Sequence, residues 1–167
     1  YVGISRWPSE ATAFGYQYLS EHDVPCLIYQ GRYHLFDRAP EEEGILHQAK
    51  ENGVGFIGFS PLAQGLLTDR YLNGIPEDSR IAHGGHLKKE SLTESSLRRI
   101  KALNGIAERR GQSLAEMALA WILKDDLVTS VIVGASSTAQ LGKNLKALHS
   151  PAFTAEELEE IEQACKL

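Results

Sequence analysis

Residues 54–67 read VGFIGFSPLAQGLL, and the two halves of this stretch differ in character. The run from Val54 to Phe59 is almost continuously apolar, which is typical of a buried strand in a parallel sheet that helices cover. The half that begins at Ser60 contains a proline and a glycine, residue types that end a strand and open a loop. The stretch therefore predicts a buried parallel strand whose carboxyl end leads into a polar loop.

Three more apolar runs of this kind lie along the chain, and helical segments separate them. The runs are Tyr1 to Ser5, Cys26 to Gln30 and Ser130 to Gly134. Strands that alternate with helices form βαβ crossovers, so the predicted fold class is α/β with a parallel sheet. Four βα units are half of a TIM-type (β/α)8 barrel, for which about 250 residues are typical, and we expect the C-terminal half, strands five to eight. An open doubly wound sheet fits the same pattern.

Capping signals and apolar spacing define the helices between these strands. The helices are predicted over Ser9 to Glu21, Glu42 to Asn52 and Thr93 to Arg110, and after the capping residues Ser113, Ser137 and Thr154. Phe14, Tyr18 and Leu19 lie at helical spacing in the first helix. The helix after Ser113 has a predicted buried stripe, formed by Leu114, Met117, Ala118, Trp121 and Ile122.

Composition excludes several classes of protein. The chain has 167 residues, 43% of them hydrophobic, and a net charge of -5, which argues against a dedicated nucleic-acid binder. No apolar stretch approaches the roughly 18 residues that span a bilayer, and no secretory signal is visible at the start. Cys26 and Cys165 form no CxxC pair, which favours a reduced cytoplasmic protein.

The start of the chain and one long loop bear on its organisation. Residue 1 is a tyrosine that already opens an apolar run, and the only methionine is Met117. We therefore expect residues 1–167 to be a fragment that opens in the middle of one domain. Leu67 to Leu92 contains an Asn-Gly pair, a proline and a Gly-Gly pair, and we expect a long irregular loop there, with or without a short helix.

Two motifs match known sites in letters only. Gly53 to Gly58 fits GxGxxG, but a dinucleotide fingerprint follows a strand and opens a helix, whereas this match follows a helix and is itself the strand. His83 and His86 have no further ligands at metal-binding spacing. We therefore predict a structural role for the glycines and no metal site.

Polar residues at the carboxyl ends of the predicted strands are the candidates for ligand binding. Ser5, Gln30, Ser60 and Gln64 lie where a barrel has its mouth, and Gly134 to Ser137 lead into a helix whose amino end favours an anion. Gln140 and Asn144 follow on one face of that helix. Each has a structural alternative: a bond to a neighbouring loop for Ser5 and Gln30, a plain strand-to-loop exit for Ser60 and Gln64, a capping box for Gln140, and an exposed amide for Asn144.

These segments, taken in order, resemble the C-terminal half of an aldo-keto reductase. The resemblance covers essentially the whole chain and is strongest to the branch of L-glyceraldehyde 3-phosphate reductases and potassium-channel beta subunits. The matching stretches are GIS at 3–5, YQ at 29–30 with Tyr33, FSPLAQGLLT at 59–68, RYLNG at 70–74 and SVIVGAS at 130–136 with Gln140, Leu141 and Asn144. The combination of these blocks is specific, although no single block is.

The resemblance implies a (β/α)8 barrel that binds NADP(H) and reduces aldehydes or ketones by hydride transfer. By resemblance, Ser5 and Gln30 hold the nicotinamide carboxamide, and Phe59 stacks on the nicotinamide ring. The pyrophosphate would lie along Ser60, Leu62 and Gln64, with Arg70 in place of the family's common lysine. The adenosine 2′-phosphate and adenine would meet Ser136, Gln140 and Asn144, and Trp7 would line the pocket for a small-molecule carbonyl substrate.

The sequence also departs from the family pattern. Arg6 stands where many members have Asn or Ser, His34 replaces a common Asn, and Ser137 replaces a basic residue, which leaves the preference for NADP over NAD open. The family's catalytic Asp, Tyr, Lys and His lie in the first half of the barrel and match no residue here. We therefore expect a chain that is inactive alone and is completed by an N-terminal half-barrel or a second chain. A non-catalytic dinucleotide-binding or regulatory module and an unrelated phosphate-binding barrel fragment are the alternatives.

Overall fold

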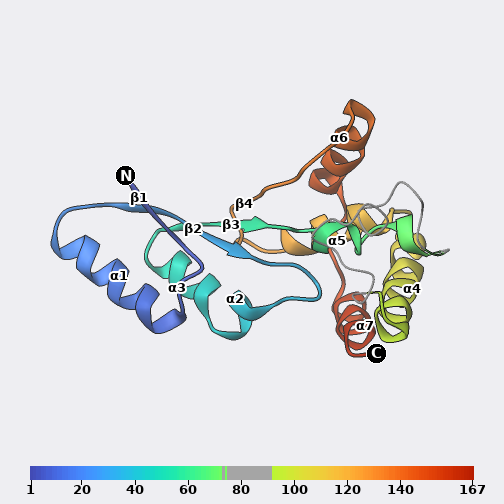
Figure 1. The fold of residues 1–167 in the computed structure, drawn as a ribbon, viewed down its shortest axis with the longest axis horizontal. Coiled ribbons are helices and arrows are strands. Elements are labelled where there is room, and N and C mark those ends of the chain that lie inside the picture. The colour runs from blue at the N-terminus through green and yellow to red at the C-terminus, as the bar shows by residue number, and fades with distance from the viewer. Residues whose placement is uncertain (73, 75–91) are drawn as a thin grey trace. The chain divides into compact units, whose positions relative to one another are not determined.

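A parallel sheet in the order β1–β2–β3–β4 organises the first of two compact units in a computed structural model of the chain (Figure 1). The structure describes residues 1–72, 74 and 92–167. The first unit comprises residues 1–61 and 122–134, and the second comprises residues 62–121 and 135–167. Most of the loop predicted over Leu67 to Leu92 lies outside the described residues, as do His83 and His86.

The four strands confirm the prediction of a parallel α/β fold. They are β1 (Val2–Ser5), β2 (Cys26–Arg32), β3 (Gly55–Phe59) and β4 (Ser130–Val131), and each pairs in parallel with the next. β4 is shorter than the predicted run to Gly134. Ile132 makes one more ladder bond, to the carbonyl of Gly58, and β3 then turns away from its neighbour because Ser60 adopts a positive φ of 54°.

The two faces of the sheet are buried to different extents. Strand register aligns Ile4, Tyr29 and Phe56 in one row, and all three side chains are buried. We call this the covered face. The next row consists of Ser5, Gln30, Ile57 and Ser130, which are half-buried or exposed, and we call this the open face. Helices of the first unit therefore cover one side of the sheet.

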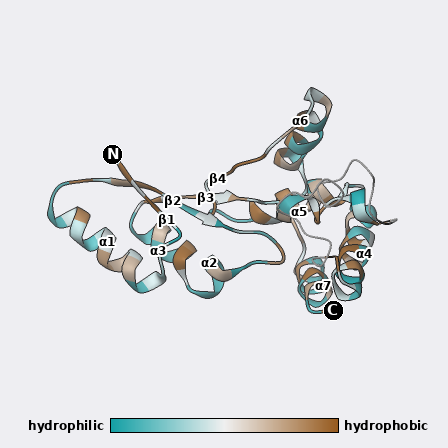
Figure 2. Cartoon of the chain, viewed as in Figure 1, coloured by the Kyte–Doolittle hydropathy of each residue, from teal (hydrophilic) through white to brown (hydrophobic). Residues whose placement is uncertain are grey.

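The helices on the covered face differ in two respects from their predictions. α1 (Ser9–Glu21) has the predicted bounds, but it buries Thr12, Gly15 and Tyr16 and exposes Phe14. A Cβ on Gly15 would lie 3.2 Å from Cδ1 of Ile4, so a small residue lets α1 approach the sheet closely. Tyr18 is exposed as well, so the aromatic residues whose spacing correctly predicted the helix do not lie on its buried face. Figure 2 shows hydrophilic and hydrophobic residues alternating along its ribbon.

The helix predicted over Glu42 to Asn52 begins later, at Ile45, and a short helix that was not predicted precedes it. α2 (Ala39–Glu42) and α3 (Ile45–Glu51) are separated at Gly44, which has a φ of 74°. A residue in the left-handed region interrupts an α-helix, and glycine adopts that conformation without steric cost. The predicted C-cap at Gly53 is confirmed by its positive φ of 67°.

The second unit is helical and follows its capping signals closely. Its α-helices are α4 (Glu94–Arg109), α5 (Leu114–Ile122), α6 (Thr138–Leu145) and α7 (Ala155–Cys165), and the last residue of α5 belongs to the first unit. Its short 3-10 helices are η1 (Ala63–Gly65), η2 (Asp69–Tyr71) and η4 (Lys146–His149). The predicted buried stripe of α5 is confirmed. Thr154 and Glu157 form the predicted capping box, and α4 packs against α7.

Candidate functional site

Three of the predicted ligand-binding residues share the open face at the carboxyl ends of their strands. Ser5 pairs in register with Gln30, and Phe59 pairs with Arg32, two residues further along the same strand as Gln30. The backbone N–H of Arg6 donates to the carbonyl of Gln30 at 3.1 Å, which keeps the ends of β1 and β2 together. The side-chain amide of Gln30 can both donate and accept hydrogen bonds, so the carboxyl ends of these strands offer the groups that a carboxamide ligand requires.

The backbone turns sharply where the chain leaves two of these strands. Arg6 follows β1 with a φ of 56°, and Ser60 follows β3 with a φ of 54°. Residues other than glycine in this region cost on the order of 1 kcal/mol or more, and such residues cluster at ligand sites. Both turns lie at the carboxyl ends of the strands that carry Ser5, Gln30 and Phe59, so strained backbone and polar side chains occur at the same end of the sheet.

Trp7 lies beside this edge, and its ring contacts the helix. A Cβ on Gly15 of α1 would lie 3.1 Å from the Trp7 ring, and 47% of the Trp7 surface is exposed. Its carbonyl accepts a hydrogen bond of 2.7 Å from the Tyr29 hydroxyl. A role for Trp7 in a substrate pocket stays a prediction.

The second unit contains the other predicted residues, in two segments. Leu62, Gln64 and Arg70 belong to a loop in which Ala63, Gln64 and Gly65 have successive positive φ angles. Thr68, which sequence reasoning missed, shapes this loop. Its hydroxyl donates to the carbonyl of Gly65 at 2.6 Å and accepts from the Arg70 N–H. A threonine two residues before the basic position was the available signal, because such hydroxyls bond the backbone locally.

The start of α6 brings two of the predicted residues into contact. Oε1 of Gln140 accepts from the backbone N–H of Ser136 at 2.6 Å and from its hydroxyl at 3.0 Å. The Ser137 hydroxyl accepts from the Gln140 N–H at 3.1 Å. The Gln140 side chain thus accepts both hydrogen bonds from Ser136, one residue before the N-cap, whereas in a full capping box it would accept from the N–H of the N-cap, Ser137. The effect is to hold Ser136 at the amino end of the helix, where the helix dipole favours an anion.

Asn144 is buried, so the expectation of an exposed amide is wrong. Its side chain is 7% exposed, and among the described residues its Nδ2 has no hydrogen-bond partner. A buried donor without an acceptor costs about 1–3 kcal/mol. An orphaned donor one helical turn beyond Gln140 fits a ligand that offers a hydrogen-bond acceptor, such as a purine ring nitrogen.

The tyrosines in β2 and just after it have engaged hydroxyls. Tyr33 is fully buried and donates to Oε2 of Glu41 at 2.7 Å, and Arg38 pairs with the same carboxylate. Lys124 lies 3.4 Å from the Tyr33 hydroxyl. Burial, followed by the Glu41 carboxylate, raises the pKa of Tyr33, which is the opposite of what a proton donor to substrate needs. Tyr33 therefore serves a structural network, despite its neighbouring lysine.

His34 stands where the family commonly has an asparagine, and its hydrogen bonding explains why a histidine can replace it. It is 7% exposed, and its Nδ1 accepts the backbone N–H of Phe36 at 3.2 Å, as an asparagine side chain does in a turn. Burial lowers the pKa of His34 to about 4, with Arg32 acting in the same direction and Asp37 opposing. The folded chain thus requires the neutral ring.

We expect His34 to make the fold acid-sensitive. The His34 ring takes up a proton near pH 6.5 in the unfolded chain and only near pH 4 in the folded chain. The free energy of unfolding is therefore at its full value above pH 6.5 and falls as the pH drops from 6.5 to 4. The loss is about 2 kcal/mol by pH 5. Urea unfolding at pH 7 and pH 5 measures it, and His34→Asn, which keeps the acceptor without the proton, should remove that part of the pH dependence. Equal acid sensitivity in both proteins would contradict this.

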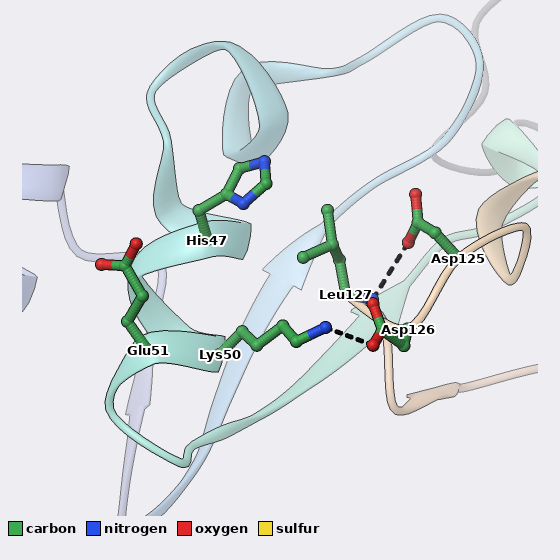
Figure 3. A pocket seen from close by; sticks show the side chains of 6 residues that line it. All are labelled: His47, Lys50, Glu51, Asp125, Asp126 and Leu127. Atoms are coloured by element: carbon green, nitrogen blue, oxygen red, sulfur yellow. Dashed lines mark hydrogen bonds and ion pairs between the residues drawn. The ribbon is translucent and has the colours of Figure 1, made fainter.

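One open cavity lies away from these residues. It has a volume of about 560 Å³ and is lined by His47, Lys50 and Glu51 of α3 and by residues 125–127 (Figure 3). An ion pair joins Lys50 to Asp126, and Asp125 accepts the N–H of Leu127 at 3.0 Å. None of the predicted ligand-binding residues lines this cavity.

Metal clusters and membrane-spanning helices are both absent from the part of the chain that the structure describes. No group of three or more His, Cys, Asp or Glu side chains among them could hold a metal ion. No helix in the described part of the chain is long and apolar enough to cross a membrane.

Comparison with known proteins gives a consistent match along the chain. The family model described as "Aldo/keto reductase family" matches residues 1–166. Proteins named "L-glyceraldehyde 3-phosphate reductase" from Escherichia coli O157:H7 and strain K12 are 49% and 48% identical over 98% of this chain and 48% of their own length. A "Probable voltage-gated potassium channel subunit beta" from Oryza sativa subsp. japonica is 36% identical over 97% of the chain and 51% of its own length. The chain thus spans about half the length of these relatives.

Proposed function

The chain belongs to the aldo/keto reductase family, and from this premise we propose that it binds NADP(H) and serves the reduction of aldehydes or ketones. Proteins of this family typically bind a nicotinamide cofactor, which supplies the hydride when bound. The observation that carries the proposal is the placement of Ser5, Gln30 and Phe59 on one face at the carboxyl ends of β1–β3. Ligands of parallel α/β folds bind at that end.

The residues present fit such a cofactor in two places. At the open face, the amide of Gln30 and the hydroxyl of Ser5 would bind the carboxamide, and the Phe59 ring would cover the nicotinamide. In the second unit, Ser136, Gln140 and Asn144 would hold the adenosine end, and the unpartnered Nδ2 of Asn144 supports this assignment. Arg70 and the 62–64 segment would neutralise and cradle the phosphates. These roles assume that the sheet is half of a (β/α)8 barrel.

We propose that the chain supplies cofactor binding and orientation without the proton donor. The Tyr33 proton is held by Glu41, and Tyr29 donates to the carbonyl of Trp7. A carbonyl substrate needs an acid beside the reacting oxygen, and neither hydroxyl is free to act as one. We also propose a cytoplasmic location, because the chain's two cysteines, Cys26 and Cys165, form no CxxC pair.

A non-catalytic dinucleotide-binding module is the second candidate function. The engaged hydroxyls of Tyr29 and Tyr33 favour it, and one relative bears the name of a channel subunit. The two candidates share the cofactor and differ in turnover. Assay of carbonyl-dependent NADPH oxidation by the longest natural form of the protein separates them, because only a reductase consumes NADPH.

Asn144 gives the sharpest test of the cofactor assignment. Asn144→Leu removes a buried donor that has no acceptor, so we expect unchanged or higher stability, by up to about 1 kcal/mol, together with about tenfold weaker NADPH binding. Fluorescence titration with NADPH and urea unfolding measure the two effects. Asn104→Leu on α4, where the amide already bonds Glu108, is the matched control and should leave NADPH binding unchanged.

Two results would count against this role of Asn144. Unchanged NADPH affinity in Asn144→Leu would remove the residue from the cofactor site. A large loss of stability would show that the Nδ2 group has a partner in the folded protein. Parallel titration with NADH decides the preference between the two cofactors, which the replacement of a basic residue by Ser137 leaves open.

A further inference from the structure

The residues that join β1 to α1 are Arg6, Trp7 and Pro8, and we call them the 6–8 turn. Arg6 has a φ of 56°. An arginine in this left-handed region has a steric cost that glycine avoids, so the conformation persists only where the surrounding structure imposes it. The turn begins directly after Ser5, one of the residues proposed to bind the carboxamide. The contacts that hold the turn therefore bear on the geometry of that site.

Two consecutive residues of β2 hold the backbone of the turn. The carbonyl of Gln30 accepts the N–H of Arg6 at 3.1 Å, and the hydroxyl of Tyr29 donates to the carbonyl of Trp7 at 2.7 Å. Tyr29 is 2% exposed, and its ring stacks on Phe56 at a centroid distance of 5.7 Å. The hydroxyl is therefore carried on a ring that has little freedom to move. β2 thus holds the chain on both sides of the strained Cα of Arg6.

A buried residue of α1 adds to this restraint. The hydroxyl of Thr12 donates to the carbonyl of Pro8 at 2.9 Å and to that of Trp7 at 3.3 Å. Thr12 is completely buried, and its N–H also donates to the carbonyl of Pro8 at 2.9 Å. The Trp7 ring lies against Gly15, where a Cβ would be 3.1 Å away. The 6–8 turn is thus fixed by hydrogen bonds at its first N–H and at its last two carbonyls.

We propose that Tyr29 is a positioning residue of the cofactor site, an inference that rests on the proposed function. Its hydroxyl fixes the carbonyl of Trp7, and this restraint holds Arg6 in its left-handed conformation and keeps Ser5 beside Gln30. Tyr29 acts through the turn because its side chain lies on the covered face, whereas Ser5 and Gln30 lie on the open face. A site that is held in its binding conformation before the ligand arrives loses less free energy in ordering when it binds.

Tyr29→Phe tests this role, because it removes the hydroxyl and keeps a ring that can stack on Phe56. We expect the Arg6 amide to exchange its hydrogen with solvent at least about fivefold faster, and NADPH to bind about fivefold more weakly. A fivefold change corresponds to about 1 kcal/mol, which is typical of one hydrogen bond. Hydrogen exchange followed by NMR and fluorescence titration with NADPH measure the two effects.

Tyr33→Phe is the matched control. It also removes a buried tyrosine hydroxyl of the first unit, which in this case donates to Glu41, and it should leave exchange at Arg6 and NADPH affinity unchanged. Thr12→Val is expected to change both in the same direction as Tyr29→Phe, whereas Thr12→Ser, which keeps the hydroxyl, should retain them. Circular dichroism shows which variants are folded, and Thr12→Val decides the outcome if Tyr29→Phe does not fold.

Three results would overturn the proposal. The first is unchanged exchange at Arg6 in Tyr29→Phe, and the second is an equal change in Tyr33→Phe, which would indicate a general loss of stability. The third is faster exchange at Arg6 with unchanged NADPH affinity, because the turn would then be held without positioning the site. Titration of the unmodified chain separates this inference from the proposed function. Failure of that chain to bind NADPH refutes the cofactor assignment, and exchange at Arg6 still decides whether Tyr29 holds the turn.

Discussion

Replacing Phe56 by alanine is expected to lower the free energy of unfolding by about 3–5 kcal/mol, as is typical for loss of a fully buried aromatic ring. Phe56 is completely buried at the centre of the covered face. Its ring stacks on Tyr29 at a centroid distance of 5.7 Å and meets Tyr33 edge-on at 6.1 Å. A Cβ on Gly31 would lie only 2.8 Å from the Phe56 ring, so the surroundings are already tightly packed and cannot collapse easily into the cavity.

Urea unfolding of Phe56→Ala against the unmodified chain measures this loss. Phe14→Ala is the matched control, because Phe14 is 67% exposed and its removal should change stability by no more than about 0.5 kcal/mol. A loss below about 1 kcal/mol for Phe56→Ala would show that the covered face is not the core of the first unit.

The second large effect is expected at Arg110, which joins the end of α4 to the segment that leads into α7. Its side chain is 4% exposed and forms an ion pair with Glu157. Nε donates to Gln112 at 2.7 Å, Nη2 donates to the carbonyl of Pro151 at 2.6 Å, and the guanidinium lies 3.9 Å from the centroid of the Phe153 ring. The N–H of Thr154 and then Arg110 keep the pKa of Glu157 low.

Arg110→Ala is expected to lower the free energy of unfolding by about 3 kcal/mol, because it leaves several partly buried groups without their partner. Arg110→Lys should recover little, since an ammonium cannot reproduce the planar fork. The control is Arg109→Ala. Arg109 and Glu160 also form an ion pair, but both are more than half exposed, so the expected change is within about 1 kcal/mol. Equal losses for the two alanine variants would contradict the role assigned to Arg110.

The sequence predicted the strand positions and helix ends well because those signals are local. The apolar run from Val54 to Phe59, the capping pair Thr154 and Glu157, and the C-cap Gly53 each act within a few residues, and the structure has them as expected. The same holds for GxGxxG at 53–58, which follows α3 and runs into β3.

Features that depend on tertiary contacts were not predictable in this way. Phe14 and Tyr18 have helical spacing, yet the small residue Gly15 is what meets the sheet, because close approach of α1 outweighs the burial of larger rings. The left-handed Gly44 delays the start of α3 to Ile45, whereas the helix was expected to begin at Glu42. Nothing in the local sequence marks Asn144 as buried or Arg110 as the centre of a network. Two partners of Arg110, Pro151 and Glu157, are distant in the chain, and Nδ2 of Asn144 has no hydrogen-bond partner within the part of the chain that the structure describes.

The sequence predicted which residues belong to the candidate site, whereas their arrangement in space depends on the register of the strands. Ser5, Gln30 and Phe59 share a face only because β1, β2 and β3 pair in parallel with the observed alignment. Ser136 and Gln140 were expected near an anion, and their direct contact shows how Ser136 is held at the helix start. The roles of Trp7, Leu62, Gln64 and Arg70 stay predictions.

Mapping of NADPH binding by NMR tests whether this chain holds a nicotinamide cofactor. Amide chemical shifts of the isotope-labelled chain are followed during titration with NADPH. We predict saturable shifts at Ser5, Gln30 and Phe59 and along residues 136–144, with residues around Lys50 and Asp126 unaffected. The absence of saturable shifts, or shifts confined to the cavity beside Lys50, would contradict the claim that this chain holds a nicotinamide cofactor.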